Sequence, residues 1–250
     1  MIAELLRTAA TYAVAGSSTI VGPIAIAAGW RNPEKSDPII RAWCEAVLKA
    51  AGLREDVAGL ENLPQGTCVF VCNHQSNFDA PFVFARIPKH IRFVAKQELY
   101  RIPIFGNVLK AMGNIRVERT GVESDRDAIQ SAVERVRTKT CILFFAEGTR
   151  STDGQLRAFK KGAAVLAIDA QVPLVPLAVA GAHEITPKGG LWVRSGRPIV
   201  LRVGKPIPTA GLGRDDRDML TARAHQAVAE LLEEGNRRVQ EMEAHGREAG

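Results

Sequence analysis

Short apolar runs alternate with longer amphipathic stretches between about residues 60 and 205. Continuous apolar runs are typical of strands buried on both faces, whereas apolar positions three and four apart are typical of helices. The predicted strands cover residues 68–72, 91–96, 115–119, 141–145, 172–179 and 199–203, and the predicted helices cover residues 80–85, 97–112, 124–136 and 160–170. Strands that alternate with helices indicate an α/β fold with a largely parallel central sheet flanked by helices.

Two later segments need separate interpretation. Residues 172–179 contain Pro173 and Pro176. Because proline has no N–H to give to a sheet, this segment is predicted to be an edge strand or an irregular one. Residues 214–243 form a long predicted helix with its apolar positions on one face, which favours packing over chemistry.

The N-terminal region has a different pattern, because the 23 residues 8–30 carry no charge. As a helix they would extend roughly 34 Å, enough to cross a bilayer core of about 30 Å. Glycine, serine and proline interrupt the stretch, so the first interpretation is a membrane-inserted or re-entrant helix, the second a surface helix and the third a cleaved signal peptide. We therefore divide the chain into a helical membrane-associating segment, 1–53, and an α/β domain, 54–250, that ends in the helix 214–243.

Net charge indicates the class of partner, and the positions of the cysteines indicate the state of their thiols. The formal net charge is +6, and the part from Arg214 onward has 6 Arg against 9 Asp and Glu, so the first 213 residues carry +9. Such an excess favours an anionic partner such as phosphate, nucleic acid or an anionic membrane surface. The four cysteines lack zinc-site spacing and lie mostly in apolar runs, which indicates free buried thiols. Cys72, close to the candidate chemistry, is predicted to be unreactive for this reason.

The stretch 73–79, Asn-His-Gln-Ser-Asn-Phe-Asp, lies between a predicted strand and a predicted helix. Open α/β sheets place their chemistry in such loops. A neutral His74 can accept a proton near neutral pH, and Asp79 would orient the ring and stabilise the imidazolium. No Gly-x-Ser-x-Gly sequence supplies a serine nucleophile, so the simplest interpretation makes His74 the base for a substrate hydroxyl. The alternative is that Asp79 caps the helix and His74 is an ordinary loop residue.

Other strand ends carry groups suited to an anion. The loop after residues 141–145 supplies a carboxylate, a glycine, a hydroxyl and a guanidinium, from Glu147, Gly148, Thr149 and Arg150. Lys96 and Arg119 end two other predicted strands. A single basic residue is more often a solvated surface charge than a ligand. Here basic residues recur at three strand ends, and the planar guanidinium of arginine can contact two phosphate oxygens at once. Together these features predict a phosphate site.

Four ordered motifs carry a family resemblance. They are Asn-His-x4-Asp at 73–79, a glycine-led strand ending in arginine at 113–119, Phe-Ala-Glu-Gly-Thr-Arg-Ser at 145–151 and Val-Pro-Leu-Val-Pro-Leu at 172–177. Together they resemble the glycerolipid acyltransferase superfamily, and within it the 1-acyl-sn-glycerol-3-phosphate acyltransferases. Ala146 departs from the family, which usually has proline there. This relaxes the backbone before Glu147 but removes no polar group.

The resemblance implies transfer of a fatty acyl group from acyl-CoA or acyl carrier protein to the sn-2 hydroxyl of lysophosphatidic acid, giving phosphatidic acid for phospholipid biosynthesis. It implies His74 as general base with Asp79 as its partner, and an acceptor phosphate near residues 147–150 with Lys96 and Arg119 as further cations. Glu147 is expected to hold Arg150 or another cation in place, or to contact an acceptor hydroxyl. No cofactor and no metal site are expected.

The expected partners are a lysophospholipid, the thioester donor and an anionic membrane surface. A nucleic acid is not expected, because the interleaved aromatics of a single-strand binder are absent. The expected location is the inner (cytoplasmic) membrane, with residues 1–53 as a two-helix motif in one leaflet and the catalytic domain facing the cytoplasm. Two alternatives stay open: an acyltransferase of this superfamily acting on a lyso-ornithine lipid or glycerol-3-phosphate, and a metal-dependent hydrolase using His74 and Asp79 as ligands.

Overall fold

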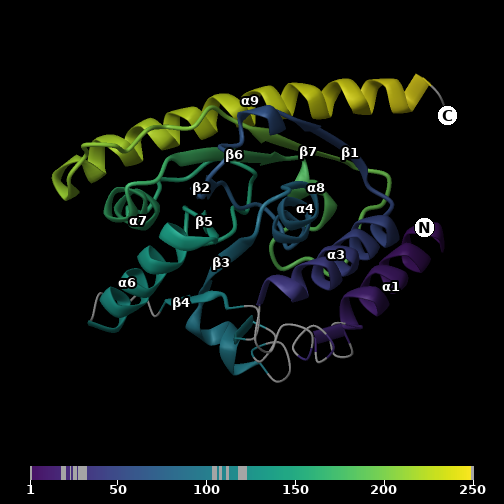
Figure 1. Ribbon diagram of the computed structural model, residues 1–250. Helices are drawn as coiled ribbons and strands as arrows, with labels where there is room; N and C mark the ends of the chain where they lie inside the picture. The colour runs from purple at the N-terminus through teal and green to yellow at the C-terminus, as the bar shows by residue number, and fades with distance from the viewer. Residues whose placement is uncertain are drawn as a thin grey trace.

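A central, mostly parallel β-sheet organises the protein (Figure 1). The computed structural model describes residues 2–17, 21–22, 24, 27, 33–102, 106, 109–110, 113–117 and 123–248. The sheet order in this part of the chain is β1-β7-β6-β2-β5-β3-β4, and the one antiparallel pairing within that order is β6 with β7. The strands are β1 (Arg54–Ala58), β2 (Val69–Cys72), β3 (Ile91–Lys96), β4 (Ile115–Val117), β5 (Cys141–Phe145), β6 (Leu174–Ala180) and β7 (Pro198–Val203). The predicted α/β class and largely parallel sheet are confirmed.

Helices cover both faces of this sheet. On one face lie α6 (Glu123–Thr138), α7 (Gly162–Ala170) and the long α9 (Arg217–Glu248), which follows the 3-10 turn Arg214–Asp216. On the other face lie α3 (Asp37–Ala51), α4 (Asp79–Arg86) and the short α8 (Ala182–Ile185). Helix α1 (Ile2–Gly16) packs on α3 and forms the outermost layer on that side (Figure 1).

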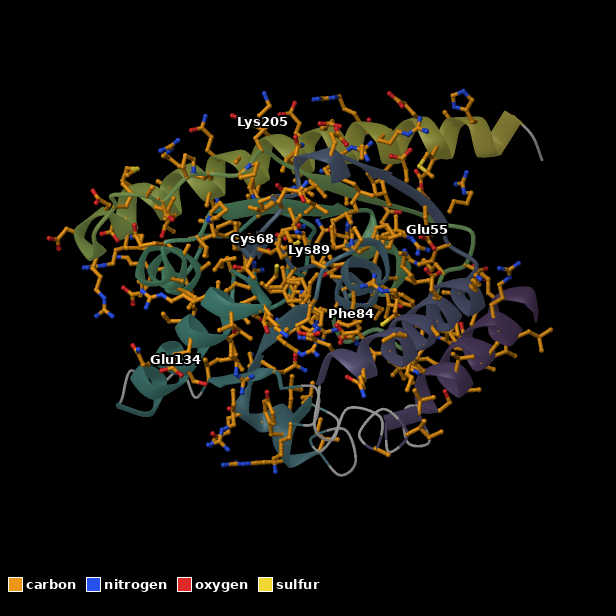
Figure 2. All side chains as sticks on the ribbon, in the orientation of Figure 1. Glu55, Cys68, Phe84, Lys89, Glu134 and Lys205 are labelled. Carbon is orange, nitrogen blue, oxygen red and sulfur yellow. The ribbon has the colours of Figure 1, made fainter. Side chains whose placement is uncertain are left out.

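Two hydrophobic cores result, one on each side of the sheet. Along β2, Phe70 and Cys72 face the core under α3 and α4, whereas Val69 and Val71 face the core under α7 and α9. Phe84 of α4 lies in the first of these layers (Figure 2), with the guanidinium of Arg41 5.5 Å from its ring centroid. Because both faces are covered, the central strands are apolar throughout, which is why they were predictable as continuous runs.

The proline-containing strand β6 is an exception to its prediction. It lies in the interior of the sheet, between β2 and β7, and is neither an edge strand nor irregular. Pro176 accepts a hydrogen bond from the N–H of Gly204, which follows the last residue of β7. The missing N–H of Pro176 therefore faces the point where the β7 ladder has ended, and an interior proline is tolerated there.

The edge strand β1 has no counterpart among the predicted strands. Its sequence, Arg-Glu-Asp-Val-Ala, contains three consecutive charges. The two acidic side chains are paired: Asp56 accepts from Arg202 Nη1 at 2.6 Å and from Arg238 Nε at 2.8 Å, and Glu55 accepts from Arg86 Nε at 2.6 Å. Because arginines from α4, β7 and α9 neutralise these two carboxylates, a polar segment forms the sheet edge.

The N-terminal prediction, a membrane-inserted or re-entrant helix within residues 8–30, falls partly outside the described residues. No helix in the described residues is both long enough and apolar enough to cross a bilayer. Helix α1 is instead held against the domain, since Trp43 Nε1 donates to the carbonyl of Val14 and Thr8 Oγ1 donates to that of Val193. Much of the uncharged stretch after residue 17 lies outside the described residues.

The predicted helix 97–112 also differs, because residues Gln97–Arg101 form a 3-10 helix.

Candidate active site

A histidine and an aspartate meet in the loop that joins β2 to α4. His74 Nδ1 and Asp79 Oδ2 are 2.7 Å apart, and the side chain of Asp79 is fully buried while 22% of His74 is exposed. Asp79 is the first residue of α4, so its carboxylate reaches back over the loop that precedes the helix. With Nδ1 engaged, Nε2 is the ring nitrogen left for a substrate.

The Asp79 carboxylate is held by the loop itself. Its Oδ2 also accepts the backbone N–H groups of Gln75 at 2.6 Å and Ser76 at 2.8 Å. Hydrogen bonds of this kind are charge-assisted and stabilise the ionised form of a carboxylate. The His74 ring is further oriented by stacking on Phe145 of β5, with ring centroids 4.2 Å apart. Asp79 therefore positions the imidazole, and the capping interpretation alone does not account for its contacts.

Glu147 joins two loops by accepting backbone hydrogen bonds: the β2–α4 loop, and the loop of residues 146–161 between β5 and α7, which carries the third motif and is called the third loop. Its Oε1 accepts from the N–H of His74 at 2.7 Å and its Oε2 from that of Arg157 at 3.2 Å. The side chain is buried, and burial raises the pKa of its carboxyl, against the opposing effect of these two N–H groups. The contacts of Glu147 in the structure are therefore with backbone N–H groups and not with Arg150, and the expected contact with an acceptor hydroxyl stays a prediction.

Asn73 fastens the start of the same loop to the sheet. Its side-chain amide donates to the carbonyl of Val179 and accepts from the N–H of Val179, both at 2.8 Å. The amide thus continues the β2–β6 ladder one residue beyond Cys72. The Cys72 thiol beside it is buried, and burial raises its pKa well above the usual value, so its predicted inertness agrees with the structure.

The third loop presents Thr149 and Arg150 beside the dyad. Gly148 has φ +74°, a backbone conformation that favours glycine, and its N–H closes a turn onto the carbonyl of Phe145. Lys188, from the segment after α8, donates to Thr149 Oγ1 at 3.1 Å and to the carbonyl of Arg150 at 3.3 Å. Within the described part of the chain, the guanidinium of Arg150 has no hydrogen bond or ion pair of its own. Two cations and a hydroxyl are therefore available to an anion.

These groups line one cavity of about 730 Å³. His74, Thr149 and Arg150 line it together with Lys96, which is exposed at the end of β3. Arg119 lies outside the described residues. Much of the remaining wall is apolar and comes from α1, α3, α4 and the neighbouring strands, including Tyr12, Ile40, Trp43, Val47, Phe84 and Phe93. The cavity thus combines a base, cations and a hydrocarbon-like wall.

Comparison with known proteins assigns the chain to a family. The Acyltransferase family model matches residues 54–180, which include the dyad and the third loop. This chain belongs to the acyltransferase family. Its structure is similar to the crystal structure of the 1-acyl-sn-glycerophosphate (LPA) acyltransferase PlsC from Thermotoga maritima, with TM-score 0.78 and 25% identity over 93% of this chain and 96% of that one.

Curated relatives of this acyltransferase have similar names. A chloroplastic 1-acyl-sn-glycerol-3-phosphate acyltransferase of Brassica napus is 33% identical over 72% of this chain, and a 1-acyl-sn-glycerol-3-phosphate acyltransferase of Pseudomonas aeruginosa is 29% identical over 78%. The chain spans about half the length of the first plant relatives it matches, 51% and 49%, and 77% of the Pseudomonas protein.

Sequence reasoning missed Lys188 in this acyltransferase. The Thr-Pro-Lys-Gly-Gly stretch that contains it follows a buried strand, which is the same signal that identified Arg150. Helix α8 separates it from that strand, so its position above Thr149 was visible only in the structure. No group of three or more potential metal ligands occurs in the part of the chain that the structure describes.

Proposed function

We propose that this acyltransferase moves a fatty acyl group from a thioester, acyl-CoA or acyl carrier protein, to the sn-2 hydroxyl of lysophosphatidic acid. The observation that carries the proposal is the cavity that an Asp79-oriented His74 and the guanidinium-bearing Arg150 line together with apolar side chains. A phosphate, a hydroxyl and an acyl chain are the three parts that such a cavity matches. The names of the relatives favour the same acceptor.

In the proposed mechanism, His74 Nε2 accepts the proton of the acceptor hydroxyl as its oxygen attacks the thioester carbonyl. The tetrahedral intermediate collapses, the carbon–sulfur bond breaks, and the imidazolium returns the proton to the leaving thiolate. Asp79 holds the productive tautomer and stabilises the imidazolium. No covalent enzyme intermediate is needed, because a thioester is already activated.

Arg150, Lys188 and Lys96 would bind the acceptor phosphate. Arginine can contact two phosphate oxygens at once, while each lysine contributes a point charge. Thr149 accepts from Lys188, so its own proton is free to point toward the anion. Fixing both reactants in this way can remove roughly 7–11 kcal/mol of the barrier, more than a general base contributes.

The test is acyl transfer by purified protein, given labelled acyl-CoA and a panel of lysolipids, with products identified by mass spectrometry. Phosphatidic acid should form with lysophosphatidic acid. Product from a lyso-ornithine lipid or from glycerol-3-phosphate instead would replace the acceptor with one of the alternatives. The variant His74→Ala should lower kcat by about 10²- to 10⁴-fold, the usual contribution of a general base. Near-normal turnover by a folded variant would defeat the mechanism.

Variants of the cations separate binding from chemistry. Arg150→Ala and Lys188→Met should each raise KM for the acceptor by roughly 10- to 100-fold, the equivalent of losing one charged hydrogen bond, with a smaller effect on kcat. Lys205→Ala is the matched control, since Lys205 is exposed beside α9 and away from the cavity lining (Figure 2). An unchanged KM in Arg150→Ala would remove this residue from the phosphate site.

We further propose that the protein works at the inner face of the cytoplasmic membrane, where its acceptor resides, with the segment 1–53 associated with one leaflet through the exposed side of α1. The support is the net charge of +6 together with exposed apolar side chains on α1, Leu5 and Leu6. Basic residues near an anionic surface contribute about 1 kcal/mol each.

A further inference from the structure

The loop between α8 and β7 carries two adjacent, strongly exposed hydrophobic side chains near its middle. Leu191 is 75% exposed and Trp192 is 63% exposed, and no other pair of chain neighbours beyond α1 in the described residues exposes two large apolar groups in this way. Scattered surface leucines are ordinary, but a leucine and a tryptophan side by side form an apolar tip. We call Leu191 and Trp192 the apolar tip.

The tip is held in place from below. Directly after it, Val193 is buried, and its N–H and carbonyl both bond to Thr8 Oγ1 of α1, at 3.2 Å. The carbonyl of Trp192 accepts from Thr186 Oγ1, and the N–H of Arg194 bonds to the carbonyl of Ile185. A loop anchored on both α1 and α8 keeps its two apolar side chains outward, where water solvates them poorly.

The tip continues into the outward side of α1. Beside the Thr8–Val193 contact, α1 exposes Leu5 and Tyr12, at 52% and 47%, which lie three residues before and four residues after Thr8 and so on its side of the helix. Lys188 and Arg194 are exposed on either side of the tip in the sequence. One surface therefore combines an aromatic ring, aliphatic side chains and flanking cations, the combination that proteins place at a membrane–water interface.

The cavity reaches this surface. Tyr12, Val193 and Lys188 all line it, so its wall includes residues of α1 and of the loop that carries the tip. We propose that Leu191 and Trp192 insert into the headgroup region of an anionic bilayer, as a second insertion point beside α1, and so present the cavity to the leaflet. The reason to expect a bilayer there, and not a protein, rests on the proposed function, because a lysolipid acceptor has to leave a leaflet to enter the cavity.

The experiment measures vesicle binding and acyl transfer separately. Sedimentation with vesicles of phosphatidylethanolamine and phosphatidylglycerol compares the parent with Leu191→Ser/Trp192→Ser. We expect the double variant to bind at least about tenfold more weakly, which corresponds to about 1.4 kcal/mol. Its transfer to an acceptor dispersed in detergent should match the parent, because neither side chain lines the cavity. Met219→Ser, which changes an exposed residue of α9, is the control.

Insertion itself is read from tryptophan fluorescence. Vesicles with brominated acyl chains should quench part of the emission, and that part should disappear in Trp192→Phe. Equal vesicle binding by the double variant and the parent would overturn the proposal, and so would unchanged quenching in Trp192→Phe. A double variant that fails equally in detergent would place the tip in folding or catalysis and would also overturn it. Since binding is measured without acyl transfer, a wrong acceptor assignment leaves these results unaffected.

Discussion

One oxygen of Asp79 makes the hydrogen bonds that position His74 and its loop. Oδ2 receives the His74 ring and two backbone N–H groups, whereas Oδ1 is buried without a partner among the described residues. The carboxylate therefore orients the imidazole from a loop that its own hydrogen bonds keep folded. The loop conformation and the orientation of His74 both depend on Asp79 Oδ2. A substitution that tests the negative charge of Asp79 must therefore keep the size and shape of its side chain.

Asp79→Asn preserves the shape and removes the charge. The amide oxygen can keep the backbone bonds, but a neutral group no longer stabilises the imidazolium, and we expect kcat to fall by about 10²- to 10⁴-fold. Steady-state kinetics with a thermal-unfolding check measures this, and Asp215→Asn, an exposed aspartate next to α9, serves as the control. A variant with parental kcat would show that His74 needs no charged partner.

The buried carboxyl of Glu147 predicts how the stability of the protein changes with pH. Burial raises its pKa above the usual 4.5, so in the window above that value the folded state binds the proton more tightly than the unfolded state does. Stability then falls as pH rises through the window. The parent should lose stability relative to Glu147→Gln between about pH 4.5 and neutral pH, in urea unfolding of both proteins. A difference that moves the other way would mean that the His74 and Arg157 N–H groups outweigh burial.

At the scale of elements, the hydrophobic pattern recovered the strands that are buried on both faces. β2, β3, β5 and β7 lie within a residue or two of their predicted bounds. β2 and β5 are continuous apolar runs, and such a run has few other stable arrangements in an α/β domain. β1 could not be found this way, since its Asp56 is neutralised by Arg202 and Arg238, which are remote in sequence. The interior place of β6 depends on where β7 ends, which is a property of the pairing.

For the site residues too, some positions were predictable from the sequence and others were not. His74 and Arg150 follow apolar strands in sequence, and the expectation that they line one cavity agrees with the structure. The backbone role of Glu147 was not predictable, because its partners are N–H groups of two loops rather than side chains. Lys188 was missed because a short helix intervenes between it and its strand. Local patterns thus predict which residues are near strand ends, and only the assembled loops decide what each one contacts.

At the scale of the whole molecule, the two faces of the sheet differ in what they contain. The face covered by α6, α7 and α9 contains one of the two hydrophobic cores, whereas the cavity described above lies on the face covered by α1, α3 and α4. The dyad sits at the carboxyl end of β2, where both layers end. Stability and substrate binding should therefore be separable by choosing the face that is changed.

Leu220→Ala and Val47→Ala test this division. Leu220 of α9 is fully buried in the hydrophobic core under α7 and α9, and its truncation should lower the free energy of unfolding by about 2–5 kcal/mol while KM and kcat stay near parental values below the unfolding temperature. Val47 of α3 lines the cavity, so its truncation removes less buried volume but enlarges the site. We expect Val47→Ala to shift the preference among acyl chains of different length, measured as kcat/KM for a series of donors and acceptors. If Leu220→Ala shifted that preference as strongly as Val47→Ala did, the two cores would be coupled through the sheet and the cavity could not be assigned to one face.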